Sequence, residues 1–259
     1  MLNYITHGAA TDQPNLVIGH GLFGSGRNWG VIAKRLSDSR QIIAIDQRNH
    51  GQSPRADSHS YADMAADLIE LLHKIKQDTG QTADVLGQSM GGKAAMVAAI
   101  QAPDLIRRLI VADIAPVAYA HDQSQHIAAM RAVDLTTVQK RSDAAAQLAA
   151  MGTDPALQSF FTQSLDVTAR VWRFNLDVLE REMPKILSFP DVAGQFTGPT
   201  LFLAGKESNY VRPEDRSKIS ALFPRARIVR LAGAGHWLHA DAPRPFEAAV
   251  RQFLDAQID

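Results

Sequence analysis

Residues 83–95 of this chain read ADVLGQSMGGKAA, a short apolar run that leads into Gly-x-Ser-x-Gly and then into an alanine-rich, helix-favouring run. This pattern predicts a strand that turns sharply into a helix, with Ser89 at the turn. Glycines at positions 87 and 91 allow the two elements to pack closely, and the strained turn lifts the serine hydroxyl clear of the sheet. The pentapeptide alone also occurs in plain loops, so the strand before it and the helix after it are what indicate a nucleophile.

A serine nucleophile of this kind needs backbone amides that stabilise the oxyanion of the tetrahedral intermediate. The amide of Met90 is expected at the first turn of the helix, where unpaired N–H groups and the helix dipole favour negative charge. The second donor is expected in the loop His20-Gly21-Leu22-Phe23-Gly24, which follows an apolar strand. The amide of Leu22 is the first choice there, and the amide of Phe23 is the second.

The hydroxyl also needs a base, since serine is a poor nucleophile until a neighbour takes its proton. His236 fits best, because residues 232–235 read AGAG and form a flexible loop that could bring the imidazole over Ser89. His239 is the rival, with a surface or supporting role as its alternative. A zinc site built from His236, His239 and Asp241 lacks a helix to align the ligands, so no metal is expected.

Composition narrows the class of protein. The 259 residues, 46% of them hydrophobic, are enough to bury one sizeable core with room for an insertion. The formal charge is zero, so there is no basic field for nucleic acid or anionic lipid, and the absence of cysteine excludes disulfides and thiolate chemistry. The first residues show no leader pattern and no run approaches the ~20 apolar residues of a membrane span. We expect a soluble, cytoplasmic monomer or small homo-oligomer.

The chain alternates short apolar runs with helical patterns, which predicts an α/β fold with a mostly parallel sheet flanked by helices. Helical spacing of apolar residues is clear from Tyr61 to Ile75 and again from Phe246 to Leu254. The expected strands are 15–19, 41–45, 83–86, 109–112, 200–203 and 227–231.

The stretch 117–197 breaks this rhythm, because it is rich in alanine, glutamine and charge, has helical periodicity and contains no convincing strand. We therefore expect a core formed by residues 1–116 and 198–259, with a helical cap at 117–197. Four aromatic residues of this cap are candidates for the wall of an apolar acyl pocket: Phe160, Phe161, Trp172 and Phe174. The alternative for each of them is the cap's own core.

Four segments in this order resemble the α/β-hydrolase superfamily along nearly the whole chain. They are 20–24 (HGLFG), 46–53 (DQRNHGQS), 87–93 (GQSMGGK) and 233–237 (GAGHW). Residues 113–116 (DIAP) and 172–175 (WRFN), together with Lys93, are similar to small bacterial carboxylesterases of the YbfF type. The resemblance implies hydrolysis of esters, with thioesters as a further class, and no cofactor. It also implies that residues 46–53 form a structural turn.

The orienting carboxylate departs from the commonest superfamily pattern, because Ser208 stands where that pattern has an aspartate. Glu207 is adjacent but would point from the wrong side of the turn, and Asp241 is better placed to begin the final helix. Asp113 ends the strand 109–112, and the resembling esterases place their acid there. The alternative is that Asp113 only caps the strand end.

These residues predict a Ser-His-Asp triad that hydrolyses small or medium acyl esters through an acyl-serine intermediate. Cofactor-free carbon–carbon bond hydrolases and haloperoxidases share this triad and remain alternatives. A remote alternative is an NAD(P)-binding oxidoreductase, because residues 19–24 match G-x-G-x-x-G and Asp46 follows at the distance of a ribose ligand. That interpretation leaves Ser89 and His236 without a role.

Overall fold

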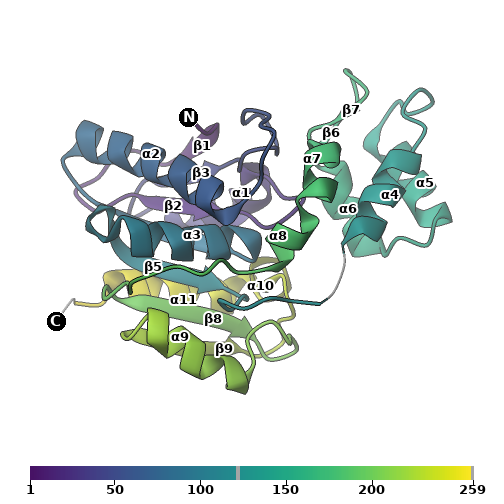
Figure 1. Ribbon diagram of the computed structural model, residues 1–259. Coiled ribbons are helices and arrows are strands. Elements are labelled where there is room, and N and C mark those ends of the chain that lie inside the picture. Colours follow the sequence, from purple (N-terminus) through teal and green to yellow (C-terminus); the bar gives the residue numbers. More distant parts are fainter. Residues whose placement is uncertain (121–122, 258–259) are drawn as a thin grey trace.

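The computed structural model of the chain describes residues 1–120 and 123–257, and a seven-stranded sheet forms its centre (Figure 1). The strand order is β1-β3-β2-β4-β5-β8-β9, with β1 antiparallel to β3 and the other neighbours parallel. The bounds are β1 Tyr4–His7, β2 Leu16–Gly19, β3 Ile42–Ile45, β4 Ala83–Gln88, β5 Ile106–Ala112, β8 Thr200–Gly205 and β9 Ala226–Leu231. The predicted α/β class is confirmed.

Helices cover both faces of the sheet, and each face has its own buried apolar cluster. One cluster includes residues of α2 (Tyr61–Thr79), α3 (Met90–Gln101) and α9 (Arg216–Leu222). The other includes residues of α1 (Gly30–Leu36), α10 (Leu238–Asp241) and α11 (Pro243–Asp255). Burial on both faces explains why β2 and β3 are continuous apolar runs instead of alternating ones. Short 3-10 helices lie at Gly26–Trp29, Pro103–Leu105 and Pro213–Asp215.

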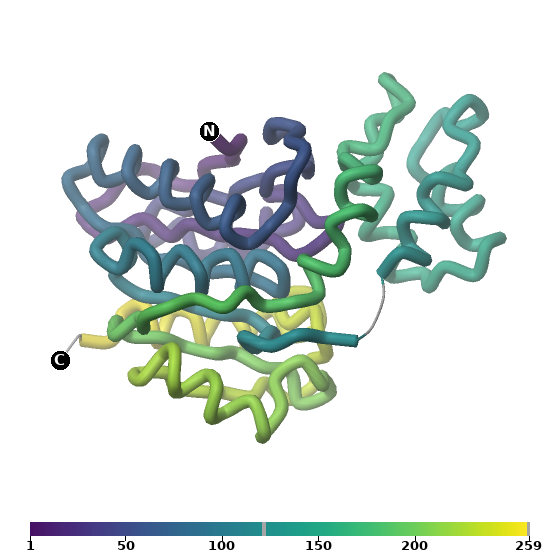
Figure 2. Tube along the Cα trace, viewed as in Figure 1, coloured from purple at the N-terminus to yellow at the C-terminus, as the bar shows by residue number. Residues whose placement is uncertain are grey.

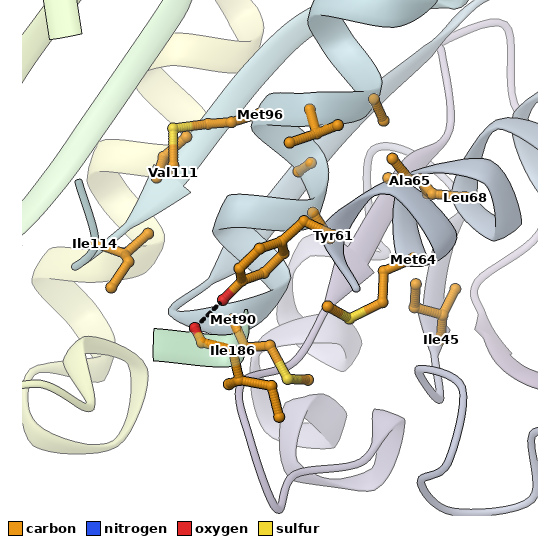
Figure 3. Packing of buried hydrophobic residues seen from close by; sticks show 14 of the residues in the cluster. Ile45, Tyr61, Met64, Ala65, Leu68, Met90, Met96, Val111, Ile114 and Ile186 are labelled. Carbon is orange, nitrogen blue, oxygen red and sulfur yellow. Dashed lines mark hydrogen bonds between the residues drawn. The ribbon is translucent and has the colours of Figure 1, made fainter. Parts of the chain in front are cut away.

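Helix α2 shows how local sequence sets the bounds of an element. Ser60 and Asp63 form a capping box at its start, and Gly80 ends it with a φ of 72°. Between them the apolar stripe that includes Met64, Ala65 and Leu68 faces α3 and the sheet (Figure 3). This packing fixes the helix that carries Ser89.

The segment between β5 and β8 forms a separate group of small elements beside the sheet (Figures 1 and 2). It contains α4 (Ser124–Ala132), α5 (Arg141–Ala150), α6 (Pro155–Thr162), β6 (Leu165–Asp166), β7 (Val171–Trp172), α7 (Leu176–Arg181) and α8 (Met183–Leu187). The expectation that this stretch has no strand was wrong, because β6 and β7 pair as an antiparallel hairpin. Two-residue strands are too short to show an alternating pattern. No helix within 1–120 and 123–257 is long and apolar enough to cross a membrane.

Candidate active site

Ser89 lies at the junction of β4 and α3, with φ 52° and ψ −120°. The close approach that produces this turn depends on its glycines. A Cβ on Gly87 would lie 2.3 Å from the carbonyl oxygen of Gly91, and a Cβ on Gly91 would lie 2.5 Å from that of His20. A side chain at either position would therefore push the helix away from the sheet edge.

His236 and Asp113 complete a continuous hydrogen-bonded series with Ser89. The Nε2 atom of His236 lies 3.1 Å from the Ser89 hydroxyl oxygen, and its Nδ1 atom lies 2.8 Å from Oδ2 of Asp113. The three residues come from different elements: the turn after β4, the loop after β9 and the end of β5. The sheet thus brings together three groups that lie far apart in the sequence.

The carboxylate of Asp113 is buried and fully bonded. Oδ1 accepts the amide of Gly205 at 2.9 Å, and Oδ2 accepts the hydroxyl of Ser208 at 2.5 Å. Glu207 is exposed and its side chain makes no hydrogen bond or ion pair with another described residue. Asp241 instead accepts the amide of Gly235, which steadies the loop before His236. The geometry therefore favours Asp113 as the acid.

Sequence reasoning singled out Ser208 only as a missing aspartate, and it passed over Tyr210. The ring of Tyr210 stacks on the imidazole of His236, with centroids 3.8 Å apart and planes inclined by 20°. The hydroxyl of Ser208 also accepts the amide of Tyr210 at 3.3 Å. The sequence held one signal for these contacts of Ser208 and Tyr210. Ser208 stands at the position where the commonest superfamily pattern has its acid, and a residue at that position is expected to lie near the histidine.

The rival histidine lies elsewhere. His239 stacks against Trp29 at 4.2 Å and packs near Phe246, on the face of the sheet covered by α11. Burial lowers the pKa of His239 to about 4. Its side chain has no hydrogen bond to Ser89, so His236 is the histidine that the structure brings to Ser89.

The amides of the loop after β2 differ in whether they are already hydrogen-bonded. Among the described residues, no acceptor is found for the amides of Leu22 and Met90, whereas the amide of Phe23 donates to Nε2 of His50 at 3.2 Å. Burial keeps the pKa of His50 well below its ordinary value, so its neutral ring is available as an acceptor. The structure therefore favours Leu22 over Phe23 as the partner of Met90.

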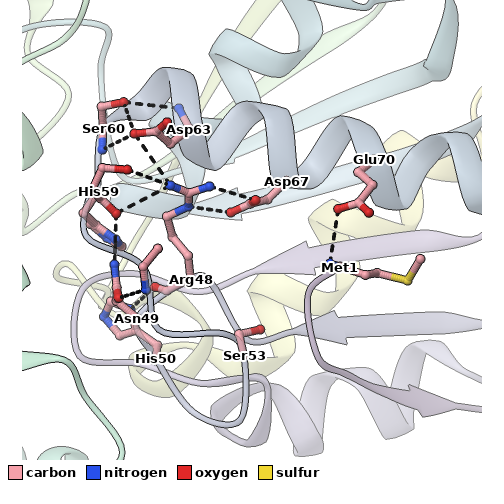
Figure 4. Close-up of polar contacts among 12 residues, drawn as sticks. Met1, Arg48, Asn49, His50, Ser53, His59, Ser60, Asp63, Asp67 and Glu70 are labelled. Atoms are coloured by element: carbon pink, nitrogen blue, oxygen red, sulfur yellow. Dashed lines mark hydrogen bonds and ion pairs between the residues drawn. The ribbon is translucent and has the colours of Figure 1, made fainter.

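His50 belongs to a turn that is held by an extensive polar network (Figure 4). Its neighbour Arg48 binds the carboxylate of Asp67 at 2.6 and 2.9 Å. Asp46 accepts hydrogen bonds from Asn3, Gly26 and Gln52. These bonds occupy Asp46 within the fold, as a structural turn requires, and leave it unsuited to bind a ribose.

A pocket of about 690 Å³, including its open mouth, adjoins Ser89. Its walls come from the sheet edge and from the inserted segment: Gly21, Leu22, Phe23, Tyr61, Gln88, Ser89, Met90, Lys93, Ile114, Tyr119, Gln123, His126, Leu157, Phe160, Phe161, Ile186, Leu187, Tyr210, His236 and Trp237. Most of these side chains are apolar or aromatic. The pocket can therefore receive the hydrocarbon part of a small ester.

Only two of the four expected aromatic residues line this pocket. Phe160 and Phe161 do, but Trp172 and Phe174 do not, which corrects the expectation for that pair. Both are buried, and the indole N–H of Trp172 donates to the carbonyl of Met130 at 2.8 Å. The ring of Phe174 packs edge-on against Phe23. Trp172 and Phe174 belong to the core that joins the insertion to the sheet, because their polar and apolar contacts are all internal.

The described residues contain no group of three or more His, Cys, Asp or Glu side chains arranged to hold a metal ion.

Residues 14–243 match a family model described as the alpha/beta hydrolase fold. The chain is 41% identical over 252 residues to the sn-1-specific diacylglycerol lipase ABHD11 of Mus musculus, covering 93% of this chain and 81% of that protein. It is 39% identical over 243 residues to Esterase YbfF of Escherichia coli (strain K12), covering 93% and 92%.

A solved structure titled "Marine microorganism esterase" superposes with a TM-score of 0.88 at 36% identity, covering 97% of this chain and 98% of that one. The similarity thus extends over the central sheet, the segment between β5 and β8, and the loops that carry Ser89 and His236.

Proposed function

The chain belongs to the alpha/beta hydrolase fold family, and from this premise we propose that Ser89, His236 and Asp113 are its catalytic triad. The protein is a carboxylic ester hydrolase of the serine esterase type. The observation that carries the proposal is the unbroken series Asp113–His236–Ser89, with separations of 2.8 and 3.1 Å.

The geometry supports a two-stage mechanism. His236 takes the proton of Ser89 as the hydroxyl oxygen attacks the ester carbonyl, and the amides of Leu22 and Met90 bind the oxyanion. The imidazolium then protonates the departing alcohol and leaves an acyl-serine. Water then attacks this acyl group while His236 accepts a proton from the water, and the imidazolium returns that proton to the Ser89 oxygen as the acid leaves. Asp113 holds the ring so that Nε2 faces Ser89 throughout.

We propose small or medium acyl esters as substrates, with thioesters as a further class, because the pocket is mostly apolar and small. Carbon–carbon bond hydrolysis and haloperoxidase chemistry on the same triad are the alternatives, and a panel of acyl esters and acyl-CoA thioesters would separate these classes. The cytoplasmic location and the monomeric or small oligomeric state also stand as proposals, to be checked by cell fractionation and light scattering.

Covalent labelling tests the nucleophile. A fluorophosphonate should modify Ser89 alone, since an activated serine attacks phosphorus as it attacks an acyl carbon. Peptide mass spectrometry locates the label, and hydrolysis of 4-nitrophenyl butyrate gives the activity. Ser89→Ala should abolish both, whereas Ser37→Ala, at the end of α1, should preserve both. Labelling of another residue in active enzyme would refute the assignment.

A further inference from the structure

Lys93 is a buried cation on the wall of the catalytic pocket. It lies one helical turn beyond the nucleophile, and its amide donates to the carbonyl of Ser89 at 3.1 Å. Residues four apart lie on the same face of a helix, and long side chains lean toward its N-terminus. The side chain therefore runs toward the same pocket as the serine, and the residue is only 1% exposed.

Within residues 1–120 and 123–257, the Lys93 ammonium has no counter-ion. Its Nζ atom donates to the carbonyls of Leu187 at 3.1 Å and Ser188 at 2.5 Å, and it lies 4.7 Å from the ring centre of Tyr119. No described carboxylate forms an ion pair with it. An ammonium has three N–H donors, so these two carbonyls leave one donor without an oxygen acceptor among the described residues.

Anchoring of the chain after α8 does not by itself explain a lysine here. Tyr61 already holds the last turn of α8, directly before that segment, because its hydroxyl donates to the carbonyl of Ile186 at 2.5 Å (Figure 3). A buried charge is costly unless an opposite charge accompanies it. Accordingly, burial lowers the pKa of Lys93 to about 7. A ligand carboxylate in the pocket would supply the missing charge.

We propose that Lys93 is an anion-binding subsite of the acyl pocket, and that the enzyme prefers esters whose acyl chain ends in a carboxylate, as in monoesters of short dicarboxylic acids. This rests on the proposed esterase function. The scissile carbonyl is held at Ser89 while the far carboxylate meets the ammonium one turn along α3. Apolar side chains such as Leu157, Phe160 and Ile186 surround the methylene groups between these two ends.

The other titratable groups around this pocket do not replace Lys93 as the anion site. Among the described residues they are Tyr61 on α2, Tyr119 after β5, His126 on α4, Tyr210 after β8 and His236 after β9, with Asp113 behind His236. Burial raises the pKa of each tyrosine and lowers the pKa of His126, so all four favour their neutral forms. His236 acts on both esters in the same way, so the effect of its titration on kcat/KM cancels in the ratio of the two substrates.

A matched pair of substrates tests the subsite. The 4-nitrophenyl monoester of glutaric acid carries the terminal carboxylate, and the corresponding ester of its monoamide has the same shape without the charge. Wild-type enzyme at about pH 6 should give a kcat/KM about tenfold or more higher for the carboxylate ester, the order expected of a hydrogen bond between charged groups. The rates of spontaneous hydrolysis without protein are subtracted as background, and Ser89→Ala is assayed beside the wild type.

The pH dependence identifies the group responsible. Because kcat/KM reports the free enzyme, the preference should fall as pH rises above about 7, where Lys93 loses its proton, and should be largely lost by about pH 9. Lys93→Met should bring the ratio close to one at every pH. Lys93→Arg should keep the preference at high pH, because arginine stays protonated.

The outcomes separate the two proposals. Hydrolysis of both esters by wild-type enzyme with equal kcat/KM, or a preference that does not change between about pH 6 and about pH 9, overturns the subsite and leaves the esterase proposal intact. Hydrolysis by Ser89→Ala at the wild-type rate, well above the rate without protein, overturns the esterase proposal and the subsite with it. The wild-type ratio needs no variant, so a Lys93 variant that fails to fold does not prevent the test.

Discussion

Ser89 and Asp113 both adopt left-handed backbone angles, with φ of 52° and 50°. Such angles cost about 1–3 kcal/mol for a residue with a side chain. The sheet holds both in place, since Ser89 donates its amide to Ala112 and Asp113 donates its amide to Leu203. Each side chain is thereby turned away from its strand direction and toward His236.

The sequence offers more than one candidate for the acid of the proposed triad, and a conservative substitution at Asp113 tests the assignment. Asp113→Asn should fold normally, because an amide is similar in shape to the carboxylate and still accepts hydrogen bonds. Its turnover should fall by up to about 10⁴-fold, because an amide N–H facing Nδ1 would favour the wrong imidazole tautomer. Circular dichroism and kcat for 4-nitrophenyl butyrate measure the two effects.

Glu207→Gln is the matched control for this substitution. Its carboxylate is exposed and unbonded within the described chain, so kcat should match that of wild type. If Glu207→Gln were inactive and Asp113→Asn active, the acid would lie on the turn after β8.

The sequence could reveal Ser89, His236 and the loop of Leu22, because each belongs to a motif with its own local chemistry. It could not reveal that Ser208 donates to Asp113 or that Tyr210 stacks on His236, since those contacts join separate strand ends. Aromatic residues of the insertion were ambiguous for a similar reason. The sequence around Trp172, which lies in the two-residue strand β7, does not show whether its ring faces a pocket or the core.

At the scale of elements, the oxyanion loop depends on its neighbouring turn. Nε2 of His20 accepts the amide of Gln47 at 2.9 Å, and Nε2 of His50 accepts the amide of Phe23 at 3.2 Å. The rings of the two histidines lie 5.1 Å apart. Burial lowers the pKa of both, so each remains a neutral acceptor. These reciprocal bonds fix the position of the Leu22 amide without using it.

Two glycines in helices offer a matched comparison of close packing. Gly91→Ala would place a Cβ 2.5 Å from the carbonyl oxygen of His20 and 2.6 Å from that of Gly19. Separation of α3 from the oxyanion loop should destabilise the fold by about 3 kcal/mol or more and reduce activity. Urea denaturation measures the stability.

The control is Gly30→Ala, at the start of α1. Nothing lies within 4 Å of the added Cβ, and the residue has a φ of −51°. Alanine should therefore raise stability by about 0.5–1 kcal/mol with activity unchanged. Equal effects of the two substitutions would show that contact with the loop does not explain the glycine at position 91.

The interior strands β2, β3 and β8 were predicted correctly, because they are buried on both faces and their apolar runs are continuous. The edge strand β9 was also predicted, although its burial is mixed. The pattern missed β1, an edge strand whose four residues alternate between exposed and half-buried positions. It also missed the hairpin of β6 and β7. Short or edge strands depend on partners from elsewhere in the chain, so their own residues carry little signal.

At the scale of the whole molecule, the carboxyl ends and the amino ends of the parallel strands carry different kinds of residues. Ser89, Asp113 and the loop before His236 all follow the carboxyl ends of strands, where the insertion also contributes pocket walls. The amino ends carry a charged cluster instead. There Asp84, at the start of β4, binds Arg40 at 3.4 Å and Arg107 at 2.5 Å. The residues proposed for catalysis and the buried ion pairs of Asp84 therefore lie at opposite ends of the strands.

This separation predicts that stability and activity can be changed independently. Asp84 is fully buried and Arg40 is 2% exposed, so Asp84→Asn leaves a buried guanidinium with a weaker partner. Removal of one member of a buried ion pair lowers the free energy of unfolding by about 3–5 kcal/mol. Because the asparagine side chain can still accept a hydrogen bond from Arg40, we expect a loss of about 3 kcal/mol for Asp84→Asn. The midpoint of urea denaturation should fall with an unchanged m-value.

Activity should not follow stability in this variant. Asp84 and Ser89 lie at opposite ends of β4, about 16 Å apart at the usual rise per residue, so kcat at 25 °C should match wild type. Asp255→Asn is the control, because that carboxylate pairs with the same Arg40 but its side chain is 57% exposed. Screening by solvent should limit its effect to about 1 kcal/mol or less. If Asp84→Asn and Asp255→Asn shifted the midpoint equally, burial would not be what makes the Asp84 pair important.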